Sequence, residues 1–313
     1  MAGTLVKKCF DLKYLHVLYE RDYDMEKRKD IDMLRFYEGD IRIRTSENRL
    51  LFKDFSKNSG NPQDKLWGDK EGYRTLNALL FDGYNNERER IQKEMHLLNP
   101  AFIELLEETL DIYKGVFSTM CGKKETVASV SKVRRVDRRA SLSAYEKGTT
   151  ESFVSCSKGP YGTDFSKKNQ VILLEIEIPE NSPYVDYQQV LAEEYEKWDE
   201  QEVLFPPFLP VTIKEIDLSR REKLSIHDMH GNPPIGKYLL KMGEFPDYRK
   251  VISFSQKELL EKLLTGKEEA AICLQKMNVG QWDEDFQKYV NWKEYLHDYL
   301  KLVYSDMWYG EKE

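Results

Sequence analysis

Two glutamates in the stretch DEQEVLFPP, residues 199–207, form the pair in this sequence that is best suited to chemistry. Glu200 and Glu202 precede an apolar run typical of a strand. Because side chains alternate along a strand, residues i and i+2 are expected to share a face. Neighbouring carboxylates repel each other unless they face solvent or a cation lies between them. The pair therefore predicts either a solvated acidic edge or a site for a positively charged or reactive group.

Two stretches upstream also carry residue types that suit a site. KVRRVDRR, residues 132–139, is a basic run inside a strand-like segment, where an inward arginine would need an anionic partner such as pyrophosphate. The alternative is a solvated charge run or a partner-binding patch. ESFVSCSKG, residues 151–159, places Ser155 and Ser157 on one face of a strand. No G-x-S-x-G elbow accompanies them, which disfavours a serine hydrolase.

Two other patterns are better explained as ordinary structure. GNPPIGKY, residues 231–238, fits G-x-x-x-x-G-K, but its prolines remove backbone donors and Tyr238 replaces the hydroxyl residue that binds magnesium. His227 and His230 have the i, i+3 spacing of metal ligands on a helix, but no third ligand lies nearby. We therefore expect a turn and a solvated pair, with no metal site.

Read in order, the arginine, Ser-x-Ser and Glu-x-Glu stretches resemble the R-S-E class of mono-ADP-ribosyltransferases, the clostridial-toxin-like, arginine-specific group. KVRRVD resembles the first-strand arginine motif, with Arg135 as the motif residue and Arg134 as the alternative. FVSCS resembles F-x-S-T-S, with Ser155 as the motif serine. DEQEVLFP resembles the E-x-E-x-L-[FL]-P entry with Glu202 and Glu200, and YRTLNALLF resembles the helix that precedes the core. The resemblance covers residues 72–220.

The resemblance implies that NAD is bound as a substrate and cleaved at the nicotinamide–ribose bond, without a metal. Glu202 would hold the ribose 2′-OH and stabilise the oxocarbenium-like ribose. Ser155 would orient Glu202 by a hydrogen bond, and Arg135 would bind the pyrophosphate. Ser157 would also lie in the NAD site, and Phe165 would stack on nicotinamide, a role for which Tyr161 competes.

The resemblance also implies the acceptor side of the reaction. Glu200 would engage the guanidinium of an acceptor arginine, and a cation between Glu200 and Glu202 would offset their repulsion. Trp198 would contact the target protein, because an exposed tryptophan is a frequent interface anchor. Burial of Trp198 against the sheet is the alternative.

Composition limits the classes of partner. The chain has 313 residues and a net charge of −7, which argues against broad nucleic-acid binding. Its longest apolar runs are too short to cross a membrane, and its first residues lack the apolar core of a secretory signal. Four cysteines without a C-x-x-C pair are typical of a reducing compartment. We expect a cytoplasmic protein, or an effector secreted without a cleaved signal peptide.

The order of helical and strand-like patterns is helices, then strands, then helices, which predicts an α+β protein. The resemblance implies a core of two packed, mostly antiparallel sheets with flanking helices. We place this core at residues 71–220, after a charged N-terminal flanking region at 1–70 and before a mainly helical extension at 221–313.

The sequence therefore predicts a mono-ADP-ribosyltransferase that transfers ADP-ribose from NAD to a protein arginine and releases nicotinamide, with NAD glycohydrolase activity as a side reaction. The first alternative is an inactive NAD-binding or protein-interaction module on the same fold. The second is an unrelated α+β protein in which the motifs coincide by chance. A bacterial toxin or effector role and an intracellular regulatory role stay open, as does an antitoxin or regulatory partner beside the target protein.

Overall fold

The computed structural model describes the chain in separate stretches. They are residues 30–31, 33–34, 37, 76–77, 79–80, 101–104, 106–121, 132–159, 171–179, 181–190, 201–230, 233–278 and 286–310. The chain divides into two compact units. The first comprises Met1–Leu79, Asn86–Val116 and Lys257–Tyr299, and the second comprises Leu80–Asn85, Phe117–Gln256 and Leu300–Glu313.

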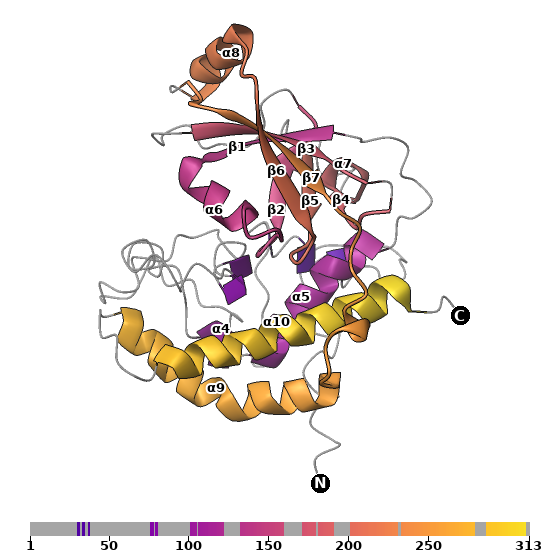
Figure 1. Cartoon of the computed structure of the whole chain (residues 1–313). Coiled ribbons are helices and arrows are strands. Elements are labelled where there is room, and N and C mark those ends of the chain that lie inside the picture. The colour runs from indigo at the N-terminus through magenta and orange to yellow at the C-terminus, as the bar shows by residue number, and fades with distance from the viewer. Residues whose placement is uncertain are drawn as a thin grey trace, which may run out of the picture. The chain divides into compact units, whose positions relative to one another are not determined.

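The second unit is built on a mixed sheet (Figure 1). Its strands are β1 (Lys132–Arg138), β2 (Val154–Ser157), β3 (Val171–Glu177), β4 (Val185–Asp186), β5 (Glu202–Phe205), β6 (Val211–Ile216) and β7 (Lys237–Met242). They lie in the order β4-β5-β2-β1-β3-β7-β6, and β3 and β7 are parallel while the other neighbours are antiparallel. The predicted α+β class is confirmed.

The two predicted sheets correspond to two halves of this one sheet. Strands β1 and β3 are in register over the full length of β1. Between β1 and β2, in contrast, the register consists of a single pair of Cα partners, Arg134 and Ser157. Strand β2 instead pairs along its whole length with β5 on its other side. The halves β4-β5-β2 and β1-β3-β7-β6 therefore meet at one narrow junction, which lies at the end of the Ser-x-Ser strand.

Short helices and one longer helix lie between the strands of this unit or follow the last of them. They are η5 (Arg139–Ser141), α6 (Leu142–Tyr145), α7 (Tyr187–Val190), α8 (Arg220–His230) and η7 (Tyr248–Lys250). A capping box precedes α8, because Ser219 Oγ accepts a hydrogen bond from Glu222 N and Glu222 Oε2 accepts one from Ser219 N. Ile226 of α8 packs in a buried cluster with Val136 and Leu173. Helix α8 is thus fixed on the half of the sheet that contains β1.

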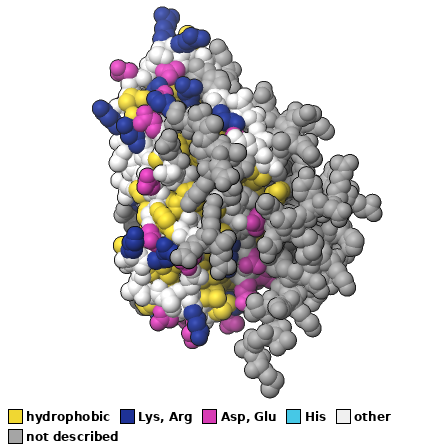
Figure 2. Space-filling model, turned by 90° about the vertical axis from the view of Figure 1, so that its right-hand side faces the viewer, with side chains coloured by type: hydrophobic (Ala, Val, Ile, Leu, Met, Phe, Trp, Pro, Cys, Tyr) yellow, Lys and Arg dark blue, Asp and Glu magenta, His cyan; other side chains and the backbone are white. Residues whose placement is uncertain are grey.

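Charged side chains of alternating sign link β1, β3 and β7. Lys132 Nζ lies 3.1 Å from Glu175, and Lys237 Nζ lies 3.2 Å from Glu175 and 2.8 Å from Glu222. Cross-strand pairs of opposite charge stabilise a sheet, and part of the basic run at 132–139 is used in this way. Figure 2 shows Lys and Arg side chains interspersed with Asp and Glu on one face of the molecule.

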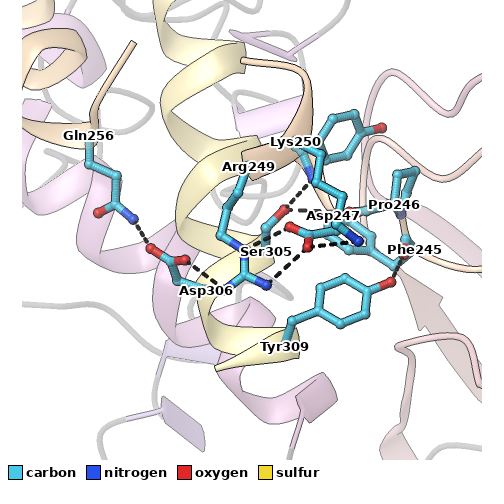
Figure 3. A network of polar contacts seen from close by, with 10 residues as sticks. Phe245, Pro246, Asp247, Arg249, Lys250, Gln256, Ser305, Asp306 and Tyr309 are labelled. Carbon is cyan, nitrogen blue, oxygen red and sulfur yellow. Dashed lines mark hydrogen bonds and ion pairs between the residues drawn. The ribbon is translucent and has the colours of Figure 1, made fainter. Parts of the chain in front are cut away.

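The C-terminal end of α10 (Phe286–Tyr309) is tied to the segment that follows β7 (Figure 3). Tyr248 N donates to Ser305 Oγ at 3.0 Å, and Arg249 bridges Asp247 and Asp306 at 2.7 and 3.3 Å. Hydrogen bonds from Arg249, together with its charge, lower the pKa of Asp247 to about 2. The last turns of α10 therefore belong to the same unit as the sheet.

The first unit is helical in its described part, with α4 (Ala101–Glu104), most of α5 (Leu106–Cys121), α9 (Gln256–Asn278) and the first part of α10. The predicted order of helices, then strands, then helices agrees with these elements, because α4 and α5 precede the strands and α9 and α10 follow them. Trp292 Nε1 donates to the Leu263 carbonyl at 3.0 Å, and Gly266 leaves room for the indole. None of the helices in the described ranges combines the length and apolar character that crossing a bilayer requires.

Candidate active site

Ser155 and Glu202 meet on neighbouring strands. Strands β2 and β5 are antiparallel, with Ser157 opposite Glu202 and Ser155 opposite Leu204. Residues directly opposite each other, and those two positions further along, share one face of a sheet. Ser155, Ser157 and Glu202 therefore lie on a common face, and the Ser155 hydroxyl donates a hydrogen bond to Glu202 Oε1. Side chains 47 residues apart in sequence are thus brought into direct contact.

Burial makes this contact consequential for Glu202. The residue is 7% exposed, at the start of a strand whose four residues are all buried. A buried carboxylate needs hydrogen-bond partners. A buried polar group left without a partner destabilises the fold by about 1–3 kcal/mol, and a charged group by more. Ser155 supplies such a partner and fixes the orientation of the carboxylate. Ser157, 3% exposed, accepts a hydrogen bond from Gly159 N at 2.9 Å and shapes the turn that ends β2.

Arg135 of β1 contacts the backbone of Ser155. Its Nη1 donates to the backbone carbonyl of Ser155 at 2.5 Å, and its Nε donates to Asp137 Oδ2 at 2.8 Å. The guanidinium is therefore tied to the same residue whose hydroxyl contacts Glu202. Arg134, the alternative motif arginine, is instead the register partner of Ser157. By this register Arg134 shares the face of Ser157 and Glu202, whereas the Arg135 side chain, with that of Asp137, belongs to the reverse face and contacts Ser155 through its backbone carbonyl. Which of the two arginines serves the site stays a prediction.

Asp137 orients Arg135, and the sequence motifs did not single it out. It is 5% exposed and also accepts hydrogen bonds from Arg138 N at 2.7 Å and from Ser141 Oγ at 2.8 Å. Burial alone would raise its pKa, but the charge and hydrogen bond of Arg135 hold the pKa below its usual value. Although burial opposes it, the charge of Asp137 raises the pKa of Arg135. The available signal was the R-x-D spacing, which places both side chains on one face of a strand.

Cys156 lies between the two site serines but is not suited to act as a nucleophile. Its side chain is fully buried. Burial raises the pKa of its thiol, and the charges of Glu202 and Asp137 add to this effect against that of Arg135. A thiol that stays protonated at neutral pH is inert, because the thiolate is the reactive form. Cys156 therefore serves as a packing residue behind the strand.

The remaining predicted site residues, Glu200, Trp198 and Phe165, lie outside the described residues, as does the competing Tyr161. Strand β5 begins at Glu202, and Gln201 has a φ of +48°, in the left-handed region. The role of Glu200 stays a prediction.

Gln201 is a strained position immediately before Glu202. A left-handed conformation is unfavourable for a non-glycine residue by about 1–2 kcal/mol, and it persists only where neighbouring contacts enforce it. The Gln201 carbonyl accepts a hydrogen bond from Lys158 N at 3.0 Å. The strained residue is therefore attached to the end of the Ser-x-Ser strand.

Among the residues that the structure describes, no group of three or more His, Cys, Asp or Glu side chains could hold a metal ion. On one face of the sheet the Ser155 hydroxyl meets the buried Glu202 carboxylate, and the Arg135 guanidinium contacts the backbone carbonyl of the same serine. A carboxylate can stabilise positive charge that develops in a transition state, and a guanidinium can bind phosphate oxygens.

No protein-family model matches this sequence, and no curated protein is significantly similar to it. Three solved structures to which the chain is similar have low TM-scores. The catalytic domain of VahC from Aeromonas hydrophila is 17% identical, with 55% of this chain and 92% of that one covered and a TM-score of 0.33. The catalytic domain of VsdC from the same organism is 17% identical, with 55% and 93% covered and a TM-score of 0.30.

The third structure is the ADP-ribosyltransferase Vis, a toxin from Vibrio splendidus, in complex with an inhibitor. It is 11% identical, with 76% of this chain and 90% of that one covered and a TM-score of 0.31. Sequence identities this low do not transfer an activity from one protein to another.

Proposed function

We propose that this protein is an NAD-dependent mono-ADP-ribosyltransferase that transfers ADP-ribose to a protein arginine and releases nicotinamide. One observation carries the proposal. The Ser155 hydroxyl is hydrogen-bonded to the buried Glu202 carboxylate, while the Ser155 carbonyl accepts from Arg135. Ser155 thus contacts both groups that we propose for the reaction, Glu202 for the ribose through its hydroxyl and Arg135 for the pyrophosphate through its backbone carbonyl.

In the proposed reaction the bond between the ribose C1′ and the nicotinamide nitrogen breaks, and its electron pair leaves with nicotinamide. Glu202 holds the ribose 2′-OH and stabilises the positive charge on the ribose. A guanidinium nitrogen of the acceptor then bonds to C1′ and loses a proton. Water in place of the acceptor gives NAD hydrolysis, which we propose as a side reaction.

The acceptor side rests on residues outside the described part of the chain. We propose that Glu200 engages the acceptor arginine, that Trp198 contacts the target protein and that Phe165 stacks on nicotinamide. Ser157 is proposed to line the NAD site, because it lies directly opposite Glu202. A toxin role, with an antitoxin or another regulatory partner, is a further part of the proposal.

The test incubates the purified chain with NAD and agmatine, an alkyl guanidine that stands for the arginine side chain, and follows free nicotinamide and modified agmatine by mass spectrometry. Glu202→Gln keeps the shape but removes the charge, and loss of such an electrostatic contact lowers kcat by about 100- to 1000-fold. Ser155→Ala is expected to lower kcat by about 10- to 100-fold, because misplacement of a reacting group by 1 Å has effects of this size. Glu215→Gln, at an exposed strand glutamate, is the matched control.

The alternative is an inactive NAD-binding module, which is favoured only if the wild-type chain leaves NAD intact. Calorimetric titration with NAD then decides. Binding that is weakened by Arg135→Ala would support a module that binds NAD without cleaving it. Intact NAD together with no measurable binding would refute both proposals and leave the motifs as coincidence.

A further inference from the structure

A buried ion pair lies beside the candidate site but is not part of it. Lys158, which follows Ser157 at the end of β2, places its Nζ 2.7 Å from Asp186 Oδ2 and 2.9 Å from Gln188 Oε1. The side chain of Asp186 is 2% exposed and that of Lys158 is 22% exposed. Asp186 Oδ1 also accepts a hydrogen bond from Gln188 N at 3.1 Å. Asp186 is therefore held in place on both of its oxygens.

This ion pair crosses the strand that begins with Glu202. Strand β5 lies between β4, which contains Asp186, and β2, which ends just before Lys158 (Figure 1). Neighbouring strands are about 4.8 Å apart, so β2 and β4 are separated by roughly 10 Å and a long side chain is needed to join them. Lys158 Nζ reaches Asp186 across β5 and so joins the two strands that flank it.

The pair lies on the opposite face of the sheet from the candidate site. Asp186 is the register partner of Val203, whereas Ser157 is the partner of Glu202. Because side chains alternate along each strand, Lys158 and Asp186 belong to the reverse face. The pair does not touch the carboxylate. Its two side chains join β2 and β4, the strands on either side of β5.

The backbone at this point needs such support. Gln201 is in the left-handed region at φ +48°, and its carbonyl accepts the hydrogen bond of Lys158 N at 3.0 Å. A strained residue keeps its conformation only where the surroundings enforce it. Lys158 therefore holds Gln201 through its backbone and holds β4 against β5 through its side chain.

We propose that Lys158 and Asp186 are positioning residues that hold the start of β5 so that Glu202 stays on Ser155. This proposal rests on the proposed function for its effect on turnover, but not for its effect on the strand. Both charges are to be removed together, because removing one would leave the other buried without a partner. The test variant is therefore Lys158→Met combined with Asp186→Asn.

The experiment measures kcat and KM for NAD turnover, amide hydrogen exchange in a peptide covering residues 201–205, and the thermal midpoint. We expect kcat to fall about 10-fold with KM for NAD within about twofold, because the carboxylate is misplaced while NAD contacts elsewhere persist. Exchange in the peptide should be faster. Lys158→Arg, which keeps the ion pair, should retain kcat within about threefold. The control is Lys241→Met combined with Glu177→Gln, an exposed cross-strand pair at 3.2 Å.

Two results would overturn the proposal. One is an unchanged kcat and unchanged exchange in a folded Lys158→Met/Asp186→Asn variant, and the other is an equal change in the control. If that variant is not recovered folded, Lys158→Gln, which keeps a donor for Asp186, is judged by the same criteria. If the wild type does not turn over NAD, the proposed function fails, and exchange alone then decides. Faster exchange at 201–205 supports the positioning role, and unchanged exchange refutes it.

Discussion

Replacing Asp137 by asparagine should destabilise the protein by about 3 kcal/mol, because the buried Arg135 loses its counter-charge. The asparagine oxygen can still accept from Arg138 N and Ser141 Oγ, which both contact Asp137 Oδ1. The asparagine NH₂, however, would face Arg135 Nε, so that two donors meet where a 2.8 Å ion pair was. A hydrogen bond to a charged group contributes about 1.5–3 kcal/mol, and removing one partner of a buried ion pair destabilises by about 3–5 kcal/mol.

We place the expected value at the lower end of the second range, because the Arg135 side chain retains 17% exposure. Urea unfolding of wild type and Asp137→Asn at pH 7 measures the difference. The control is Glu177→Gln, whose carboxylate is paired with Lys132 and Lys241 at a more exposed site and should change stability far less.

The same variant predicts how the stability difference depends on pH. In the folded chain the pKa of Asp137 is lowered from its usual 3.8 by Arg135. A group with a lowered pKa stabilises the folded state above its unfolded-state pKa and loses this contribution as the pH falls toward the folded-state value. The difference between wild type and Asp137→Asn should thus be constant from about pH 5 to 8 and shrink below about pH 4. A difference under about 1 kcal/mol at pH 7, or one that persists undiminished at pH 3, would refute the reasoning.

Three further changes test the packing and the backbone. Thr150→Ala should destabilise the protein by about 2 kcal/mol in urea unfolding, because Leu209 N and Pro206 O lose their buried hydroxyl partner. Thr150→Ser keeps the hydroxyl and is the control. Gly115→Ala should destabilise by about 1–3 kcal/mol, since the added Cβ would lie 2.6 Å from Met33 Cγ; a neutral result in a thermal melt would contradict this packing. Gln201→Gly should stabilise the protein by about 0.5–1 kcal/mol and so raise its thermal midpoint, because glycine adopts the left-handed conformation without strain. A lowered thermal midpoint would contradict this prediction.

The strands that carry the site were predictable because their signals are local. The runs at 132–138, 154–157, 171–177, 202–205 and 211–216 are rich in β-branched or aromatic residues and are bounded by turn residues. Ser155, Glu202 and Arg135 were proposed as site residues from short motifs in a fixed order that resemble those of a known family, and their roles stay predictions. The long C-terminal helices were predictable from their spacing of apolar residues.

Strand β7 was missed, and its position explains why. KYLLKM carries no clear alternation and contains good helix-forming residues. It is a strand because it lies between β3, to which it is parallel, and β6, to which it is antiparallel. Strand propensity depends strongly on such neighbours, so pairing overrides the local preference. Strand β7 lies beyond residue 220, where the sequence analysis placed the end of the core. The division of the chain at residues 70 and 220 stays a prediction.

Asp137 was missed for a related reason. A carboxylate within a basic run is typical of a solvated charged segment. Only the tertiary structure shows that Asp137 is buried and paired with Arg135. The left-handed Gln201 and the ion pair between Lys158 and Asp186 are likewise set by contacts between strands. The residue types at the site, and the chemistry open to them, follow from the sequence alone. Which of these residues touch follows from strand register and burial, because those join side chains far apart along the chain.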